Sequence, residues 1–251
     1  MTVTLITGAS SGIGAELARQ LAAKGEDLAL CARRTQRLEE LRAQILAAHP
    51  QCRVETRTLD VTDDAAVFEA VHAFAADFGH LDRVVVGAGL GKGGAVGTGR
   101  YAANRETAYT NVIGALAQAE AAMEVFRAQR RGHLVLISSM SAMRGLPKSV
   151  TVYAATKAFV AHLGEGIRSE MLGEPGLDIT VTTVLPGYIR SEMNEHIGKP
   201  LPFMVDTETG VRSIVAAIER KAQVARVPAW PWVPLGTAMR HLPLRVVRRL
   251  S

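Results

Sequence analysis

The sequence predicts an α/β protein with one doubly wound parallel sheet and helices on both of its faces. Short β-branched or aliphatic runs alternate with longer amphipathic stretches along the whole chain, as strands alternate with crossover helices in such folds. The length of 251 residues fits one large α/β domain, and no low-complexity linker divides it. A glycine-rich turn between Thr7 and Gly14 joins the first apolar run to the first amphipathic stretch. Together these observations indicate a single-domain Rossmann-type fold.

Each element follows from local pattern. The expected strands are the short apolar runs at residues 3–7, 28–32, 54–59, 82–86, 134–137, 179–185 and 224–227. The expected helices are the amphipathic stretches at residues 12–24, 36–48, 62–79, 104–130, 152–172 and 209–221. In the first helix Ile13, Leu17 and Leu21 recur on one face. The third begins at Thr62-Asp63-Asp64, like an N-cap followed by an acidic first turn, and ends near Gly79.

The composition is that of a soluble globular protein, with 48% apolar and 21% charged residues. The formal charge of +5 is concentrated at one end, because seven basic and no acidic residues follow Glu219. Since the charge is confined to this segment and aromatic residues make up only 5% of the chain, we do not expect nucleic-acid binding. We see no signal peptide and no apolar run of about 18 residues that would span a membrane. We expect Cys31 and Cys52 to be reduced thiols in a cytoplasmic protein.

The glycine-rich turn predicts a dinucleotide site. Its glycines allow a tight turn and a close approach of the backbone to a pyrophosphate, and the N-terminus of the following helix offers free N–H donors. A tight strand–helix turn without a ligand is the alternative, but the strand–turn–helix context favours binding. The residues expected to contact the cofactor here are Gly8, Ser10, Ser11, Gly12, Ile13 and Gly14.

The Gly-x3-Gly-x-Gly spacing of this turn, with Thr7 before it, resembles that of the short-chain dehydrogenase/reductase family, in its common branch of about 250 residues. Later motifs match the family in order over residues 4–228, nearly the whole chain. They are Asp60-Val61, Asn111, Ile137-Ser138-Ser139, Tyr153-x3-Lys157 and Pro186-Gly187-Tyr188-Ile189-Arg190-Ser191, with Ser191 where the family usually has Thr.

The resemblance implies a role for each motif. Asn111, Ser139, Tyr153 and Lys157 would be the catalytic residues. Lys157 would also reach the ribose hydroxyls of the cofactor, and Asn111 would keep a water in a proton path. The other cofactor contacts implied are Asp60 and Val61 at the adenine, the close backbone approach of Ala88 and Gly89, and Pro186, Gly187, Ile189 and Ser191 beside the nicotinamide.

The chemistry of the Tyr-x3-Lys pair can be argued from the residues themselves. Free tyrosine has a pKa of about 10, and a lysine four residues later lies on the same helix face. We expect the Lys157 ammonium to lower the pKa of Tyr153, so that its hydroxyl can exchange a proton with a carbonyl or alcohol oxygen. Ser139 would hold the substrate oxygen. Ser141 is the rival serine, but it lies beyond the end of the strand. An ordinary solvated helix pair is the other interpretation of Tyr-x3-Lys.

Two departures from the family pattern stand out. The usual Asn-Asn-Ala-Gly appears as Val86-Gly87-Ala88-Gly89, so both side-chain amides are missing and local rigidity is in question. The separation between Ser139 and Tyr153 is 14 residues, one more than usual in the family, and we expect the extra residue after Pro147.

The cofactor preference is predicted from the end of the second strand, Cys31-Ala32-Arg33-Arg34. Arginine there accommodates the 2′-phosphate of NADP, whereas NAD needs an acidic residue, and none occurs before Glu39. We therefore expect NADP(H) to be preferred over NAD(H), with Arg33 as the main contact. Two solvated arginines at the start of a helix are the alternative.

Two segments are expected near the substrate. Residues 87–99 carry seven glycines and are interpreted as a flexible loop beside the site or as a mobile surface connection. Residues 192–205 occupy the family's variable substrate region, with an apolar wall or a packed lid formed by Met193, Ile197, Leu201, Phe203 and Met204. His196 has no accompanying His/Cys/Asp cluster, so we expect no metal.

The predicted function is an NADP(H)-dependent oxidoreductase that interconverts a fairly apolar ketone and a secondary alcohol. The alternatives are 3-oxoacyl carrier-protein reduction and a catalytically silent dinucleotide-binding regulatory protein. We expect a homodimer or homotetramer, because the family assembles through its long helices and the Ala-rich residues 115–122 allow it.

We divide the chain into a catalytic domain, residues 1–228, and a basic, apolar tail, residues 229–251. In the tail, apolar residues recur every three or four positions, at Leu235, Met239, Leu242, Val246 and Leu250, and Pro243 predicts two short helical pieces rather than one. The tail is interpreted as an oligomer contact or a cover over the substrate pocket. The alternative is peripheral docking on an anionic membrane, with Trp230 and Trp232 at headgroup level.

Overall fold

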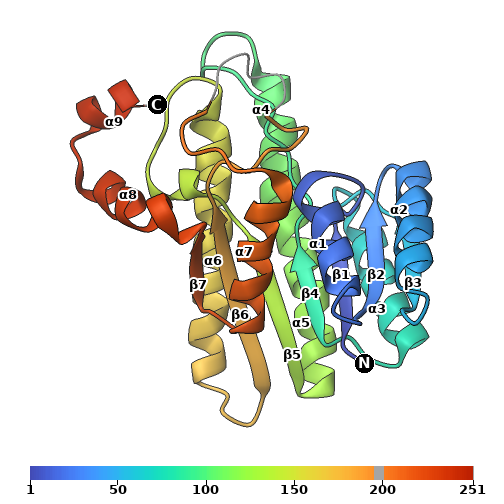
Figure 1. Cartoon of the computed structure of the whole chain (residues 1–251). Coiled ribbons are helices and arrows are strands. Elements are labelled where there is room, and N and C mark those ends of the chain that lie inside the picture. The colour runs from blue at the N-terminus through green and yellow to red at the C-terminus, as the bar shows by residue number, and fades with distance from the viewer. Residues whose placement is uncertain (195–200, 251) are drawn as a thin grey trace.

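Seven parallel strands form the centre of the molecule in a computed structural model that describes residues 1–194 and 201–250 (Figure 1). The strands are β1 Val3–Thr7, β2 Asp27–Ala32, β3 Val54–Thr58, β4 Arg83–Val86, β5 Arg131–Ile137, β6 Asp178–Pro186 and β7 Val224–Val227. Their order across the sheet is β3-β2-β1-β4-β5-β6-β7. The strand order therefore reverses between the neighbours β1 and β4, as it does in Rossmann-type folds. This confirms the predicted fold class.

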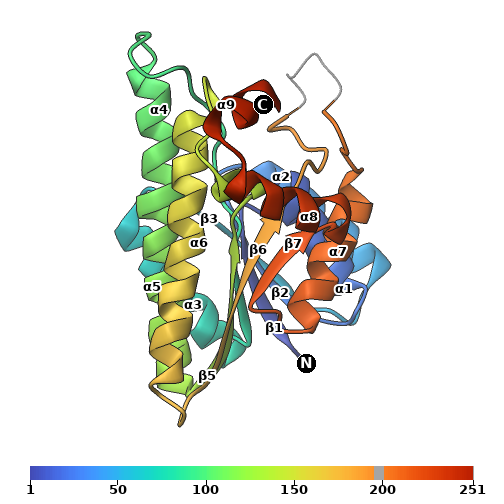
Figure 2. The same ribbon diagram turned by 90° about the vertical axis from the view of Figure 1, so that its left-hand side faces the viewer.

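Two layers of helices cover the sheet (Figure 2). The helices are α1 Gly12–Ala22, α2 Thr35–Ala48, α3 Asp64–Phe78, α4 Tyr101–Ala108, α5 Gly114–Gln129, α6 Val150–Leu172, α7 Thr207–Glu219, α8 Ala229–His241 and α9 Leu244–Leu250. Leu17 of α1, Leu38 of α2 and Ile214 of α7 belong to the apolar core on one face of the sheet. The core on the other face contains residues of α3, α5 and α6, among them Phe74 and Phe126. Both faces of the central strands are thus buried, which explains why β2 and β4 are mainly apolar, whereas the edge strand β3 is mainly polar and only partly buried.

The N-cap and the terminal glycine predicted for the third helix match the ends of α3. The side chain of Asp63 accepts a hydrogen bond from the N–H of Ala66 at the start of α3, and Gly79 ends that helix with a φ of 80°. The helix expected over residues 104–130 is divided: a π-helical turn, η1 Tyr109–Ile113, separates α4 from α5. Single π-helical turns often lie at functional sites, and this one contains Asn111.

A buried polar network lies near the start of the strands. Arg83 of β4 donates to the Glu26 carboxylate at 2.8 Å, and Thr4 also donates to Glu26. The His133 ring is bonded to the Thr182 hydroxyl at 2.8 Å. This bond satisfies a polar side chain inside the sheet. β5 begins at Arg131 and not at residue 134, where the apolar run starts, because residues 131–133 already pair with residues 178–180 of β6.

The tail folds back onto the body of the protein. As Pro243 predicted, it forms two helices, α8 and α9, and α8 contacts β7 and the 3₁₀ turn η2 Met140–Met143. Trp232 is only 4% exposed and packs with Met140 and Leu185. The expectation that Trp232 lies at headgroup level is therefore wrong, because its ring is part of the core. Trp230, by contrast, is 78% exposed. No helix in the described part of the chain is long and apolar enough to cross a membrane.

Candidate active site

The predicted site residues come from segments at the carboxyl ends of β1 to β6, together with η1 and α6, and ligands of open α/β sheets bind at that edge (Figure 1). The glycine-rich turn leaves β1 with Gly8 at a φ of 69° and Gly12 at a φ of 51°. A methyl group on Gly14 would overlap the carbonyl oxygen of Gly8, so the turn tolerates no side chain at this position. Ser11 is the N-cap of α1, but its side chain does not bind the first turn of the helix. The first-turn N–H groups are thus available to an anion, which fits a pyrophosphate.

Thr7 provides the rigidity that the missing amides put in question. Its Oγ1 accepts hydrogen bonds from the N–H groups of Gly87 and Ala88 at 3.0 and 3.2 Å, and donates to the carbonyl of Val85 at 3.3 Å. A Cβ on Gly8 would lie 2.9 Å from the Cα of Ala88, so the two loops are in close contact. One threonine hydroxyl therefore binds the backbone of the loop after β4, where the family pattern has asparagines.

Asn111 fixes the same loop from the other side. Its buried amide donates to the carbonyl of Leu90 and its Oδ1 accepts from the Leu90 N–H, both at 2.8 Å. It also donates to Thr156 on α6 at 3.0 Å. A Cβ on Gly89 would lie 3.2 Å from Asn111 Oδ1 and 3.3 Å from Lys157 Nζ, so the backbone of Gly89 runs directly beside both side chains.

The structure brings Ser139, Tyr153 and Lys157 together. Ser139 follows β5 and caps η2, where its Oγ accepts from the N–H of Ser141 at 3.1 Å. This leaves the Ser139 hydroxyl proton free for Tyr153, with which its side chain is hydrogen-bonded. Lys157 is 6% exposed, and its ammonium donates to the carbonyl of Ile137 at 2.9 Å and lies 5.8 Å from the centre of the Tyr153 ring.

The electrostatics differ from the sequence expectation. Burial raises the pKa of Tyr153 above its usual 10, the hydrogen bond with Ser139 opposes this rise, and Tyr188 adds to it. Burial also lowers the pKa of Lys157 to about 8. The expected lowering of the Tyr153 pKa by Lys157 does not appear, because burial raises it and Lys157, with a pKa of about 8, loses its charge before Tyr153 titrates. The phenol of Tyr153 is therefore protonated at neutral pH.

The arginines after β2 differ in their contacts. Arg33 lies 3.8 Å from the Asp60 carboxylate, and both side chains are exposed. Arg34 donates to Ser10 at 3.1 Å and to Ser11 at 2.5 Å, so it is attached to the glycine-rich turn itself. Arg34 and Arg37 both bind the carboxylate of Glu192. Arg34, rather than Arg33, is thus the arginine that the fold brings to the predicted phosphate-binding turn.

Aromatic side chains surround the segment after β6. The Trp232 indole covers Gly187, where any side chain would overlap the ring. It makes edge-to-face contacts with Tyr188 at 5.4 Å and Phe203 at 6.4 Å between ring centres. Of the apolar wall predicted for residues 192–205, Met193 and Phe203 are exposed. His196 and Ile197 lie outside the described residues.

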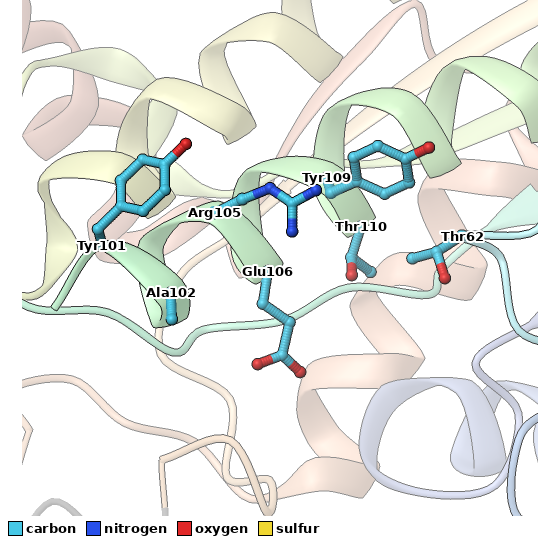
Figure 3. A pocket seen from close by; sticks show the side chains of 7 residues that line it. All are labelled: Thr62, Tyr101, Ala102, Arg105, Glu106, Tyr109 and Thr110. Carbon is cyan, nitrogen blue, oxygen red and sulfur yellow. The ribbon is translucent and has the colours of Figure 1, made fainter.

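A separate surface pocket of about 440 Å³ lies on α4 and η1 (Figure 3). It is lined by Thr62, Tyr101, Ala102, Arg105, Glu106, Tyr109 and Thr110. None of the predicted catalytic or cofactor residues lines this pocket, and Glu106 is bonded to Lys92 at 2.8 Å.

Comparison with known proteins agrees with the motifs and the fold. The model of the short chain dehydrogenase family matches residues 2–201. An uncharacterized oxidoreductase of Mycobacterium tuberculosis is 47% identical over 247 residues, which are 98% of this chain and 96% of that protein. The chain belongs to the short-chain dehydrogenase family.

Solved structures of the family show the same architecture. A short-chain dehydrogenase from Sphingobium yanoikuyae in complex with NADPH is 28% identical, with a TM-score of 0.81 over 100% of this chain and 98% of that one. One from Burkholderia phymatum in complex with NAD shares the fold at 20% identity, with a TM-score of 0.83 over 98% and 95% of the chains. The resemblance inferred from the motifs is confirmed: the protein is an oxidoreductase of the short-chain dehydrogenase family, whose fold binds a nicotinamide dinucleotide.

Three side chains near the site of this short-chain dehydrogenase were not singled out from its sequence for the roles that the structure suggests. Arg37 lies one helical turn after Arg34, a spacing that could have indicated a shared partner. Glu192 contacts both arginines from more than 150 positions away, and Trp232 covers Gly187 from the tail. No local pattern predicts these two contacts, because each joins segments that are far apart in the sequence.

Proposed function

We propose that the protein is an NADP(H)-dependent oxidoreductase that interconverts a ketone and a secondary alcohol, with Tyr153 as the general acid and base. The observation that carries this proposal is the grouping of Ser139, Tyr153 and Lys157, in which the Lys157 ammonium lies beside the backbone of Gly89. A nicotinamide cofactor, when bound, exchanges a hydride with the substrate carbon. The protein's own task is to hold the substrate oxygen and to supply or remove its proton.

The proton chemistry follows from the hydrogen bonds. In carbonyl reduction the Tyr153 hydroxyl gives its proton to the substrate oxygen, which also accepts a hydrogen bond from Ser139. Because burial raises the pKa of Tyr153, its phenol is protonated at neutral pH and ready to act as the acid. In alcohol oxidation the same group accepts the proton. The Lys157 ammonium supplies positive charge at this position and would reach the ribose hydroxyls, and Asn111 holds the loop against which the cofactor lies.

The preference for NADP(H) rests on the arginines after β2. Arg34 is bonded to both serines of the glycine-rich turn, so its guanidinium lies where a phosphate on the adenosine ribose would be recognised. Solved structures of similar proteins contain NADPH in one case and NAD in another, so the proposal depends on Arg34. Asp60 and Val61 would contact the adenine, and Pro186, Gly187, Ile189 and Ser191 would flank the nicotinamide.

The residues beside the candidate site favour an apolar ketone as substrate. Tyr188, Phe203 and Trp232 form an aromatic group after β6, and the side chain of Met193 is exposed beside the glycine-rich loop after β4.

We propose that residues 229–251 cover this aromatic group on the catalytic domain, residues 1–228, and that the protein is a cytoplasmic homodimer or homotetramer. Exposed Trp230 and Leu244, with the arginines of the tail, keep docking on an anionic membrane as the alternative. Co-sedimentation with anionic vesicles that requires residues 229–251 would favour that alternative.

Turnover of a ketone panel with NADPH, by wild type and Tyr153→Phe, tests the proposal. Wild type should reduce apolar ketones, and the variant should lose a factor of about 10²–10⁴ in turnover while its NADPH affinity stays within about twofold. Equal rates in the two proteins would disprove the mechanism. Turnover of carrier-bound 3-oxoacyl groups alone would favour the carrier-protein reductase. A wild type that binds NADPH but turns over nothing would favour the silent regulatory protein.

A further inference from the structure

Each of the three nitrogens of the Arg34 guanidinium donates to a neighbouring side chain. Its Nε donates to Ser10 and its Nη2 to Ser11, while its Nη1 donates to Oε2 of Glu192 at 2.8 Å. Arg37 donates to the other carboxylate oxygen of Glu192. One carboxylate thus joins two arginines at the edge of the glycine-rich turn.

The side chain of Asn194 fixes the turn that holds Glu192 beside the two arginines. Asn194 accepts from the N–H of Ser191 at 3.0 Å and donates to the carbonyl of Ile189 at 2.8 Å, which fixes the turn that carries Glu192. Ser191 packs on the glycine-rich turn, since a Cβ added to Gly12 would lie 3.2 Å from the Cβ of Ser191. Glu192 therefore reaches the arginines from a defined position beside the predicted cofactor site.

The carboxylate carries its charge over the whole physiological range. Hydrogen bonds from Arg34 and then Arg37 hold the pKa of Glu192 below its usual range. A carboxylate bound by two guanidinium groups uses the donors that a phosphate monoester would use, because arginine recognises both groups through the same paired N–H geometry.

We propose that Glu192 is a specificity-determining residue that competes with the 2′-phosphate of NADP(H) for Arg34 and Arg37. This inference rests on the proposed function, which assigns that phosphate to Arg34. An incoming phosphate must displace the carboxylate from Arg34 and is repelled by it as long as it stays close. NAD(H) has a ribose hydroxyl at this position and needs no such displacement. Glu192 thus narrows the difference in affinity between the two cofactors, and Arg37 becomes a second phosphate ligand once the carboxylate has moved.

Binding titrations with NADPH, NADH, adenosine 2′-monophosphate and adenosine 5′-monophosphate test this inference without measuring turnover. In Glu192→Gln the amide keeps the shape of the side chain but not its charge. We expect NADPH and adenosine 2′-monophosphate to bind about 3- to 10-fold more tightly, as for the loss of exposed ion pairs, while the affinities for the other two ligands stay within about twofold. The gain should shrink at high salt.

Glu174→Gln is the matched control, because Glu174 is an exposed glutamate bonded to Arg127 at 2.7 Å and lies far from the site. It should change none of the four affinities. Unchanged or weaker NADPH binding in Glu192→Gln would overturn the inference, since Glu192 would then be inert or would help to orient the arginines.

Arg34→Ala separates this failure from failure of the proposed function. If Arg34→Ala weakens NADPH binding selectively while Glu192→Gln has no effect, the competition is wrong but the cofactor assignment holds. If Arg34→Ala affects NADPH and NADH equally, the phosphate does not bind at Arg34, and both proposals fail.

Discussion

The side chain of Asn111 binds both backbone polar groups of Leu90, donating to its carbonyl and accepting from its N–H at 2.8 Å each. This is the pairing that a neighbouring strand would provide, made instead by one amide from a π-helical turn. The loop after β4 therefore keeps a defined path past Lys157 although it contains no regular structure. The same loop is fixed by Thr7 at its beginning.

Replacing Asn111 by Asp should loosen this loop. A carboxylate can accept from the Leu90 N–H but cannot donate to its carbonyl, which leaves a buried acceptor without a partner and costs about 1–3 kcal/mol of unfolding free energy. Urea denaturation measures the loss. NADPH affinity should fall with it, because the loop lies against the predicted nicotinamide side. If Asn111→Asp is as stable as wild type and binds NADPH equally well, the amide does not hold the loop.

The rate of carbonyl reduction should depend on pH in a defined direction. The pKa of Tyr153 is raised, so its phenol stays protonated through neutral pH and its acid form is not lost there. The pKa of Lys157 is lowered to about 8, so its ammonium loses its proton as the pH rises past that value. We expect kcat/KM for reduction to be flat from pH 6 to pH 7.5 and to fall above about pH 8. Alcohol oxidation, which needs the deprotonated tyrosine, should have a higher pH optimum. A reduction rate that rises steadily from pH 7 to pH 9 would contradict both assignments.

Arg34 and Arg33 should contribute unequally to cofactor choice. Losing one charge-assisted phosphate contact weakens binding by about 10- to 150-fold. We expect Arg34→Asp to reduce NADPH affinity by about this factor and to leave NADH nearly unchanged, because Arg34 is bonded to the glycine-rich turn. Arg33→Asp should have a smaller effect, since Arg33 faces Asp60 across 3.8 Å. Fluorescence titration with both cofactors measures the difference. If Arg33→Asp weakens NADPH binding more than Arg34→Asp does, Arg33 is the main phosphate contact, as expected from the sequence.

His133 should make the fold less stable in acid. Burial, with the charges of Arg83 and Lys221, lowers the pKa of His133 from 6.5 to about 3, so the folded state favours the neutral ring. Below pH 6.5 the unfolded chain binds the proton more readily than the folded one, and stability falls by at most about 1.4 kcal/mol per pH unit. Between pH 6.5 and pH 5 most carboxylates stay charged, so this window isolates the histidine. His133→Gln should lose this slope in urea denaturation. An unchanged slope would assign the effect to other groups.

Much of this fold could be predicted from the sequence, because its signals are local. The spacing Gly8-x3-Gly12-x-Gly14 requires a turn that only glycine can form, and the alternation of apolar and amphipathic stretches fixed the class. The meeting of Ser139 with Tyr153 was expected through the family resemblance. What could not be predicted depends on tertiary packing. It includes the burial of Tyr153 and Lys157, which raises the pKa of the first and lowers that of the second, and the burial of Trp232.

The position of Trp232 has a consequence at the level of the gene. The indole covers Gly187 and completes a small apolar cluster with Met140 and Leu185, although its codon comes after those of all seven strands. A frameshift or a stop codon just after β7 would leave the whole sheet intact and yet uncover these three residues. Such a change would uncover the segment after β6, and expression clones trimmed at the last strand would lose part of the wall beside the candidate site.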